Sequence, residues 1–143
     1  MFEAFCEFIT ENYSHARKIV EVGVGHRIDV AVKLKTRLSN AEVIVTDNDE
    51  SWVRTHKAPG IKAVLDDVMR PRLALYLGAA LVYSLHPPSE LVPSLVDLAG
   101  KVGADLLLVP VMDEQEVFHA GQWRRLTNRG RTVGWLLPNK RLG

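Results

Sequence analysis

The chain has 143 residues, of which 47% are hydrophobic and 24% are charged, and its formal net charge is +1. This length and composition fit one globular domain with one hydrophobic core, residues 1–143, and leave no room for a separate substrate domain. No apolar run approaches the ~20 residues that a membrane-spanning helix needs, the amino terminus is acidic, and Cys6 is the only cysteine, so we expect a cytoplasmic protein without a disulfide framework.

The first element is an amphipathic helix over residues 2–16, within a flanking segment of residues 1–17. Its apolar residues recur three to four positions apart, at Phe2, Phe5, Ile9 and Tyr13. This spacing places them on one face of a helix, while glutamates occupy another. Cys6 is expected on the packed side.

A glycine-containing turn joins the next strand, residues 18–24, to a helix over residues 27–38. Gly23 and Gly25 let the backbone turn sharply and leave room for a ligand against it. Ile28 stands where the dinucleotide fingerprint has its third glycine. The helix is predicted to pack through one side, formed by Ile28, Ala31, Val32, Lys35 and Leu38.

Two acids at this turn favour a cationic ligand over a pyrophosphate. Glu21 ends the strand, and Asp29 lies in the first turn of the helix, where a phosphate would otherwise be held. S-adenosylmethionine (SAM) carries an ammonium and a sulfonium and no phosphate, so it fits this turn better. His26 and Arg27 follow the glycines, and Arg27 either pairs with the carboxylate of the ligand or lies at the surface.

Strands and helices then alternate along the chain. Strands are predicted over residues 42–47, 61–65, 80–85 and 104–111, with a short helix over 71–77 and a longer one from Ser89 to Val102 that Gly103 ends. Such alternation is typical of a mostly parallel, doubly wound α/β sheet with helices on both faces. The predicted fold class is therefore a Rossmann-like α/β core spanning residues 18–111.

The carboxyl-terminal part differs in pattern and in charge. Residues 121–138 are predicted to form an antiparallel hairpin at the sheet edge, with a tight turn at Asn128-Arg129-Gly130. All acids lie at or before Glu116, and residues 121–143 carry six bases, namely Arg124, Arg125, Arg129, Arg131, Lys140 and Arg141. This segment either attracts a polyanion such as RNA or is a solvated face that balances an acidic body.

Polar residues follow every strand of the predicted core, at the sheet edge where open α/β sheets bind ligands. Asp47 comes 24 residues after Gly23, close to the ~20-residue spacing of an acid that accepts from ribose hydroxyls; a loop role stays open. Asp66 is a candidate acceptor for an adenine amino group, with Asp67 as the alternative. His86 and Ser84 end the fourth strand, where a histidine can transfer protons near neutral pH or simply bond a neighbouring carbonyl.

These residues resemble the motifs of class I SAM-dependent methyltransferases. Glu21, Gly23 and Gly25 match their first motif, and Asp47 and Asp66 stand where that family holds ribose and adenine. The segment Ser-Leu-His-Pro-Pro, residues 84–88, resembles the Asn-Pro-Pro-aromatic loop of the amino-group methyltransferases. The histidine replaces the asparagine, and a serine follows in place of the aromatic, which puts amine methylation in doubt.

The whole chain is most similar to a small uncharacterised archaeal family with a shortened methyltransferase-like fold, in which the Glu-x-Gly-x-Gly turn and a Tyr-Ser-x-x-Pro-Pro segment recur. The resemblance implies the fold and SAM as cofactor, and it implies no particular reaction. The first hypothesis is a small methyltransferase with an unknown acceptor, in which His86 and Ser84 are the candidate catalytic residues. The alternatives are a non-catalytic nucleotide- or SAM-binding module or partner subunit and, less favoured, an NAD-dependent oxidoreductase.

Two further expectations concern partners and metals. With only a short hairpin after the last parallel strand, we expect the acceptor pocket to come from the first helix and the proline loop, either within one chain or completed by a second subunit in a homo- or hetero-oligomer. The histidines lack metal-ligand spacing, and no metal site is predicted.

Overall fold

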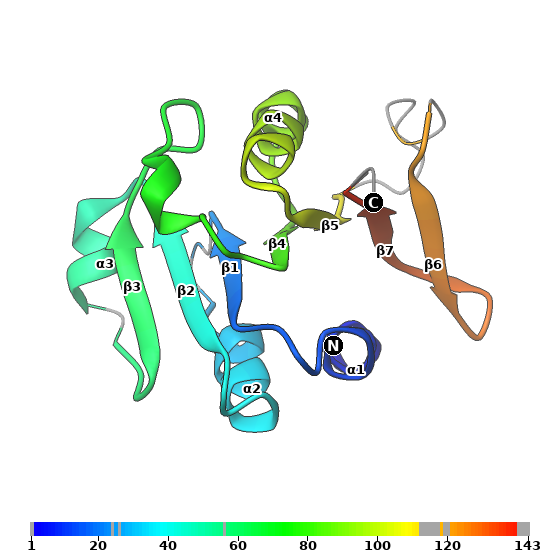
Figure 1. The fold of residues 1–143 in the computed structure, drawn as a ribbon, viewed down its shortest axis with the longest axis horizontal. Helices are drawn as coiled ribbons and strands as arrows, with labels where there is room; N and C mark the ends of the chain where they lie inside the picture. The colour runs from blue at the N-terminus through cyan, green and yellow to red at the C-terminus, as the bar shows by residue number, and fades with distance from the viewer. Residues whose placement is uncertain are drawn as a thin grey trace.

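One seven-stranded sheet organises the molecule, in the order β3-β2-β1-β4-β5-β7-β6 (Figure 1). The computed structural model describes residues 2–23, 25, 27–55, 57–111, 118 and 121–139. The strands are β1 (Lys18–Val22), β2 (Glu42–Asp47), β3 (Ile61–Leu65), β4 (Leu81–Leu85), β5 (Asp105–Val109), β6 (Arg124–Asn128) and β7 (Arg131–Leu137). The first five strands are parallel, and β7 runs antiparallel to both β5 and β6. The predicted Rossmann-like sheet with an edge hairpin is confirmed.

Helices cover both faces of this sheet. They are α1 (Glu3–Asn12), α2 (Asp29–Arg37), α3 (Glu50–Thr55) and α4 (Val92–Val102), with the short 3-10 helices η1 (Leu73–Leu75) and η2 (Ser89–Leu91). In Figure 1, α1 and α2 lie below the sheet and α4 lies above it. Gly103 ends α4 with a φ of 75°, as its predicted position requires. The first helix is shorter than predicted and ends at Asn12.

The two faces of β1 belong to different apolar clusters, because successive side chains of a strand point to opposite sides. Val20 and Val22 pack with the α4 side, whereas Ile19 packs with α1 and α2. The predicted packing side of α2 is partly wrong. Val30, Ala31 and Leu34 are its buried residues, and Val32 is 38% exposed.

The hairpin continues the sheet beyond β5. Arg129 and Gly130 both have positive φ, at 53° and 76°, so this is the tight turn predicted between the two strands. Phe118 stacks on Trp135 of β7 with ring centroids 5.2 Å apart and meets Trp123 edge-on. This aromatic cluster joins the hairpin to the core on the α4 side. Within the described part of the chain, no helix is both long and apolar enough for a membrane crossing.

Candidate functional site

A crevice lies at the carboxyl ends of the parallel strands on the α4 side, and it has a volume of about 210 Å³. It is lined by residues of four segments: the end of β1 with its glycine turn, the end of β2, the loop after β3, and the β4–α4 connection. Named in full, the lining is Val22, Gly23, Asp47, Asn48, Asp66, Asp67, Val68, Met69, Ser84, His86, Pro87, Pro88, Leu91 and Leu95. This is the sheet edge at which open α/β folds bind ligands.

The glycine turn and Asp47 form one unit within the crevice. The Asp47 carboxylate accepts from the backbone N–H of Gly25 at 2.9 Å and from that of Asp49 at 2.9 Å. Gly23 and Gly25 have φ of 67° and 62°, a backbone conformation that side chains rarely adopt, and open space lies where a Cβ would be. The turn therefore has open space beside both glycines, and Asp47 holds it in place.

Asp66 and Asp67 follow β3 and have different surroundings. The Asp66 side chain is only 2% exposed. Its Oδ2 accepts from the Tyr76 hydroxyl at 2.5 Å, and its Oδ1 accepts from the backbone N–H of Arg72 at 3.1 Å. Burial raises the pKa of Tyr76 first, and the bond to Asp66 adds to it, so the phenol stays a donor. Asp66 thus anchors the connection between β3 and β4.

Asp67 is the more accessible of the two acids. It is exposed and lines the crevice, and its Oδ1 accepts from the backbone N–H of Met69 at 2.9 Å. Its second oxygen has no partner among the described residues, which leaves it free to accept from a ligand. The sequence singled out Asp66 for this role and Asp67 as the alternative.

Glu21 does not join the acids of the crevice. It points to the sheet face covered by α1 and α2, is 1% exposed, and its Oε1 accepts from the Tyr83 hydroxyl at 2.7 Å. Burial raises the pKa of Glu21 to about 8, although the bond from Tyr83 lowers it. Glu21 is therefore part of the buried core beneath the glycine turn, and it does not line the crevice.

Ser84 and His86 line the crevice from the end of β4 and the residue after it. The Ser84 hydroxyl is buried and donates to the carbonyl of Val22 at 2.8 Å, which ties β4 to β1. His86 is exposed and has a φ of 54°, unusual for a residue with a side chain. Its backbone N–H donates to the carbonyl of Val109 at 2.7 Å, so the strained loop is held against the end of β5.

Other residues of the predicted site lie elsewhere or outside the described residues. Arg27 pairs with Asp29 through two contacts, at 2.9 and 2.8 Å, and its guanidinium lies 4.7 Å from the centroid of the Phe2 ring. Trp52, considered as a cover for an adenine ring, is buried instead against α2 and β2. His26 is outside the described residues. No group of three His, Cys, Asp or Glu side chains in the described part of the chain could hold a metal ion.

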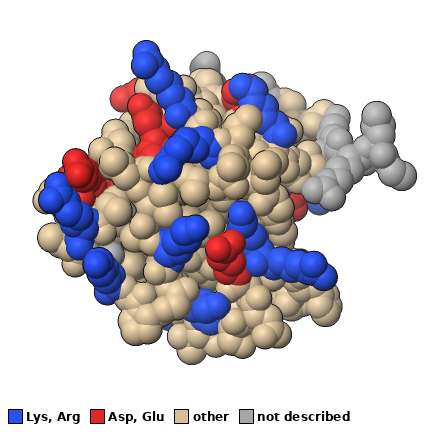
Figure 2. All heavy atoms as spheres, turned by 60° about the vertical axis from the view of Figure 1, so that its left-hand side comes forward, with Lys and Arg blue, Asp and Glu red and all other residues tan. Residues whose placement is uncertain are grey.

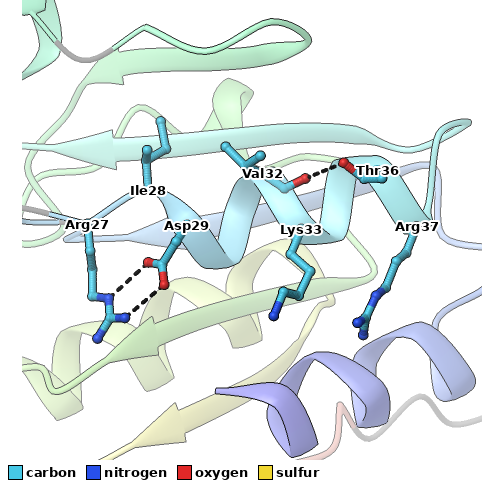
Figure 3. Close-up of a pocket in the computed structure, with 7 residues that line it drawn as sticks. All are labelled: Arg27, Ile28, Asp29, Val32, Lys33, Thr36 and Arg37. Carbon is cyan, nitrogen blue, oxygen red and sulfur yellow. Dashed lines mark hydrogen bonds and ion pairs between the residues drawn. The ribbon is translucent and has the colours of Figure 1, made fainter. Parts of the chain in front are cut away.

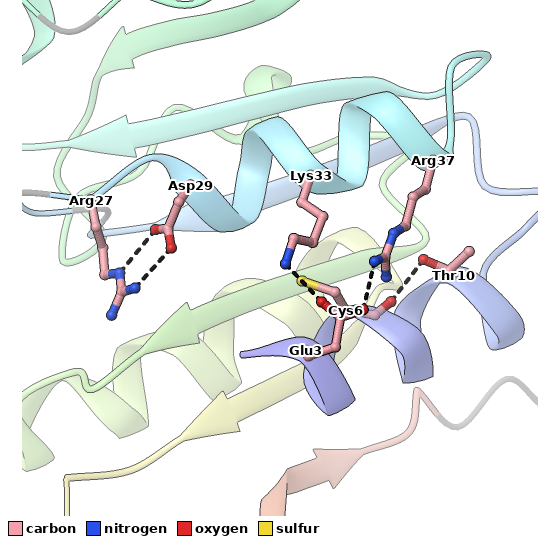
Figure 4. A network of polar contacts seen from close by, with 7 residues as sticks. All are labelled: Glu3, Cys6, Thr10, Arg27, Asp29, Lys33 and Arg37. Carbon is pink, nitrogen blue, oxygen red and sulfur yellow. Dashed lines mark hydrogen bonds and ion pairs between the residues drawn. The ribbon is translucent and has the colours of Figure 1, made fainter. Parts of the chain in front are cut away.

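A second hollow, of about 1010 Å³, lies along the outer face of α2 (Figure 3). Its charged side chains are already paired. Figure 4 shows Lys33 and Arg37 turned toward Glu3 of α1, with Nζ and Nη2 at 2.7 and 2.6 Å from its carboxylate oxygens. These bonds hold the pKa of Glu3 near 2. The charged residues that line the hollow are therefore engaged within the protein, Lys33 and Arg37 in fixing α1 to α2, and we do not regard the hollow as a ligand site.

Sequence reasoning missed the residues that position the acids. Tyr76 and Arg72 hold Asp66, and Tyr83 holds Glu21. The motifs identify the acids themselves. Their hydrogen-bond partners come from segments distant in sequence, such as the β3–β4 connection, so no local sequence pattern predicts them.

The chain is similar in sequence to one family of archaeal proteins. The model of the uncharacterised protein family UPF0146 matches residues 1–136. A UPF0146 protein of the archaeon Archaeoglobus fulgidus is 43% identical over 106 residues, which cover 73% of this chain and 75% of that protein.

The solved structures with a similar fold include O-methyltransferases and a cofactor-bound protein. The cofactor-bound structure of Rv0187 from MTB superposes with a TM-score of 0.62 at 12% identity, over 94% of this chain and 78% of that one. An O-methyltransferase of neocarzinostatin biosynthesis, NcsB1, in complex with SAM, gives a TM-score of 0.52 at 13% identity over 75% of this chain and 39% of that one. The chain spans 55% and 53% of two other methyltransferase structures that it matches. At these identities the likeness shows the fold alone.

Proposed function

The chain belongs to the archaeal family UPF0146, and on that premise we propose that it binds SAM in the crevice and transfers the methyl group to an acceptor at His86. The observation that carries the proposal is the joined unit of Asp47 and the glycine turn at the carboxyl ends of β1 and β2. The solved structure of NcsB1 with SAM, which has a similar fold, supports the choice of ligand.

The residues of the crevice fit the parts of SAM. Asp47 is placed to accept from vicinal ribose hydroxyls, because each carboxylate oxygen can accept a second hydrogen bond. Asp67 offers a free oxygen to the adenine amino group, with Asp66 as the residue that positions this loop. Val68, Leu91 and Leu95 give apolar cover for the ring. The open space over Gly23 and Gly25 leaves room for the methionine part.

The bound SAM supplies a methyl group whose bond to sulfur breaks with the electron pair remaining on sulfur, as the new bond to the acceptor forms. The protein has little covalent chemistry to do, since alignment of the acceptor gives most of the rate. His86 stands at the open end of the crevice, where its imidazole can take the proton that an acceptor oxygen or nitrogen releases. Ser84 keeps β4 and β1 in register beneath it, and a direct catalytic role would require its hydroxyl to leave Val22.

Thermal unfolding with SAM, S-adenosylhomocysteine, NAD and ATP tests the binding step. A ligand present at 100 times its Kd stabilises the folded form by about 2.7 kcal/mol, so the first two compounds are expected to raise the melting temperature by several degrees and the last two are not. Asp47→Asn is expected to abolish the rise. Asp49→Asn is the matched control, because Asp49 caps α3 through the backbone N–H of Trp52 and does not line the crevice. A larger rise with NAD than with SAM would contradict the proposal.

A non-catalytic SAM-binding module is the second candidate, and the inward bond of the Ser84 hydroxyl favours it. The two candidates differ in one measurement. With labelled SAM and fractionated cell extract, an enzyme transfers label to one fraction and His86→Ala slows the transfer. A binding module shows the thermal shift and labels no fraction.

A further inference from the structure

A groove of about 990 Å³ runs between α1 and the β6–β7 hairpin and meets the crevice at His86, which lines both. Its lining also includes Phe2, Phe5, Val109, Arg129 and Arg131. An acceptor lying in this groove would reach the crevice from the side on which His86 is exposed. His86 is thus the residue that the groove and the crevice share.

The two walls of the groove differ in charge. On the α1 wall, Glu3 is neutralised by Lys33 and Arg37, whereas Glu7 has no ion-pair partner in the part of the chain that the structure describes. On the hairpin wall, Arg129 and Arg131 are exposed and have no ion-pair partner among the described residues. An anionic group in the groove is thus drawn to the hairpin wall and away from Glu7.

The position of these arginines is fixed by the backbone. Arg129 occupies a left-handed position in the tight turn, and Arg131 begins β7. Residues 121–143 contain no acid that could neutralise them. By contrast, on the face around β3 and α3, bases and acids are interspersed (Figure 2). The hairpin is where the sequence concentrates basic charge without acids.

The floor of the groove is apolar and aromatic. The Phe2 ring lies 5.8 Å from the His86 ring and 6.2 Å from the Phe5 ring, and Val109 and Val133 complete the floor. The Arg27 guanidinium lies over one face of the Phe2 ring, 4.7 Å from its centroid, so a flat ring could pack only against the other face, with a phosphate at the arginines beside it. Aromatic contact together with basic side chains is how proteins bind single-stranded nucleic acids.

We propose that the groove binds one nucleotide of a single-stranded nucleic acid, with its base on the Phe2 floor, the base edge facing His86, and its phosphate at Arg129 and Arg131. This inference rests on the proposed function, because it names the acceptor class for the same site. A base inside a duplex cannot reach the floor, since it stays stacked between its neighbours. RNA and single-stranded DNA share the required chemistry, and both enter the test.

The test measures fluorescence anisotropy of labelled RNA and DNA strands of about twelve nucleotides, within the range of known site sizes, at ~50 mM salt. The variant Arg129→Gln/Arg131→Gln removes the phosphate contacts, and Phe2→Leu removes the aromatic floor. Arg17→Gln/Arg124→Gln is the matched control, because it removes the same charge at exposed positions that do not line the groove and have no ion-pair partner among the described residues.

The groove variant is expected to weaken binding at least tenfold and to reduce the salt dependence of log K by about 0.7, because the two arginines hold one phosphate. Phe2→Leu is expected to weaken it several-fold, and the control variant less than twofold. Equal losses in the groove and control variants would overturn the proposal, as would tighter binding of duplex or of polyglutamate, or no binding by the wild type.

The thermal shift with SAM, measured on the same proteins, separates the two proposals. If SAM stabilises the wild type and the groove variant equally while neither binds a single strand, the nucleic-acid inference fails and the proposed function stands. If the strand binds as expected but SAM gives no shift, the proposed function fails.

Discussion

At the scale of single residues, Glu21 has the most unusual surroundings in the described part of the chain. Its side chain is buried, with 1% exposed, and one of its carboxyl oxygens accepts a hydrogen bond from the Tyr83 hydroxyl. Burial raises its pKa from 4.5 to about 8. A buried carboxyl group that lacks a cation in contact is kept protonated because its charged form loses hydration.

This pKa shift makes stability depend on pH with a definite sign. Between pH 4.5 and about 8 the folded protein keeps the Glu21 proton while the unfolded chain has released it. The free energy of unfolding therefore falls as pH rises through this window, by up to about 1.4 kcal/mol per pH unit. Glu21→Gln does not titrate and retains an oxygen that accepts from Tyr83, so its stability is expected to be nearly flat over the same range.

Urea unfolding at several pH values between about 5 and 8 checks this expectation. Glu11→Gln, at an exposed position near the end of α1, is the control and should keep the wild-type slope. Parallel curves for wild type and Glu21→Gln would show that Glu21 is ionised in the folded protein.

Glu21 also shows what the sequence cannot reveal about a site. The spacing Glu-x-Gly-x-Gly correctly located the turn, and the position of Asp47 after β2 correctly brought it to that turn. Glu21 pairs with Val45, so Glu21 and Asp47, two residues further along β2, alternate to the same side of the sheet. They differ in their place along the strand: Asp47 is the last residue of β2 and reaches the crevice, whereas Glu21 is buried beside Tyr83. Which of the two acids the packed helices cover is a tertiary property that the motifs do not carry.

At the scale of elements, the glycines in β7 and α4 make a matched pair. A Cβ on Gly134 would lie 3.0 Å from the carbonyl oxygen of Leu108 in β5 and 3.4 Å from a methyl group of Leu107. A Cβ on Gly100, which is exposed in α4, would meet nothing within 4 Å. The first glycine lets β7 approach β5 closely, whereas the second only adds freedom to the unfolded chain.

We therefore expect opposite effects from one substitution. Gly134→Ala should destabilise the protein by about 1–3 kcal/mol through overpacking, and Gly100→Ala should stabilise it by about 0.5–1 kcal/mol through helix propensity. Chemical denaturation of the two variants measures both signs. A stabilising Gly134→Ala would mean that β7 lies farther from β5 than the structure places it.

Most element boundaries could be predicted because they depend on local signals. The bounds of β2 and β3 match the prediction, and Gly103 ends α4 as expected. The packing side of α2 could not be predicted. Its partners are α1 and the sheet, and Lys33 and Arg37 turn toward Glu3, which rotates Val32 away from the core.

At the scale of the whole molecule, the sheet joins two parts that differ in topology and charge. The parallel part carries the crevice, and the antiparallel hairpin carries the basic wall of the groove. The sequence could predict both parts, but not the contacts that join them. The residue that makes these contacts, Phe118, lies outside every predicted element. Its ring packs between Trp123 and Trp135 and extends the core on the α4 side into the hairpin.

This coupling predicts that hairpin and parallel core unfold in a single transition. Among the three tryptophans, only Trp52 lies outside the hairpin, so in Trp52→Phe the fluorescence reports the hairpin while far-UV circular dichroism reports the whole sheet. We expect the two denaturation midpoints to coincide, which is the signature of two-state unfolding. Phe118→Ala in the same background should lower the free energy of unfolding by the ~3–5 kcal/mol typical of a buried phenylalanine. Both midpoints should therefore fall together. A fluorescence transition that precedes the loss of circular dichroism would instead show that the hairpin opens alone, and the groove with it, while the crevice of the parallel part persists.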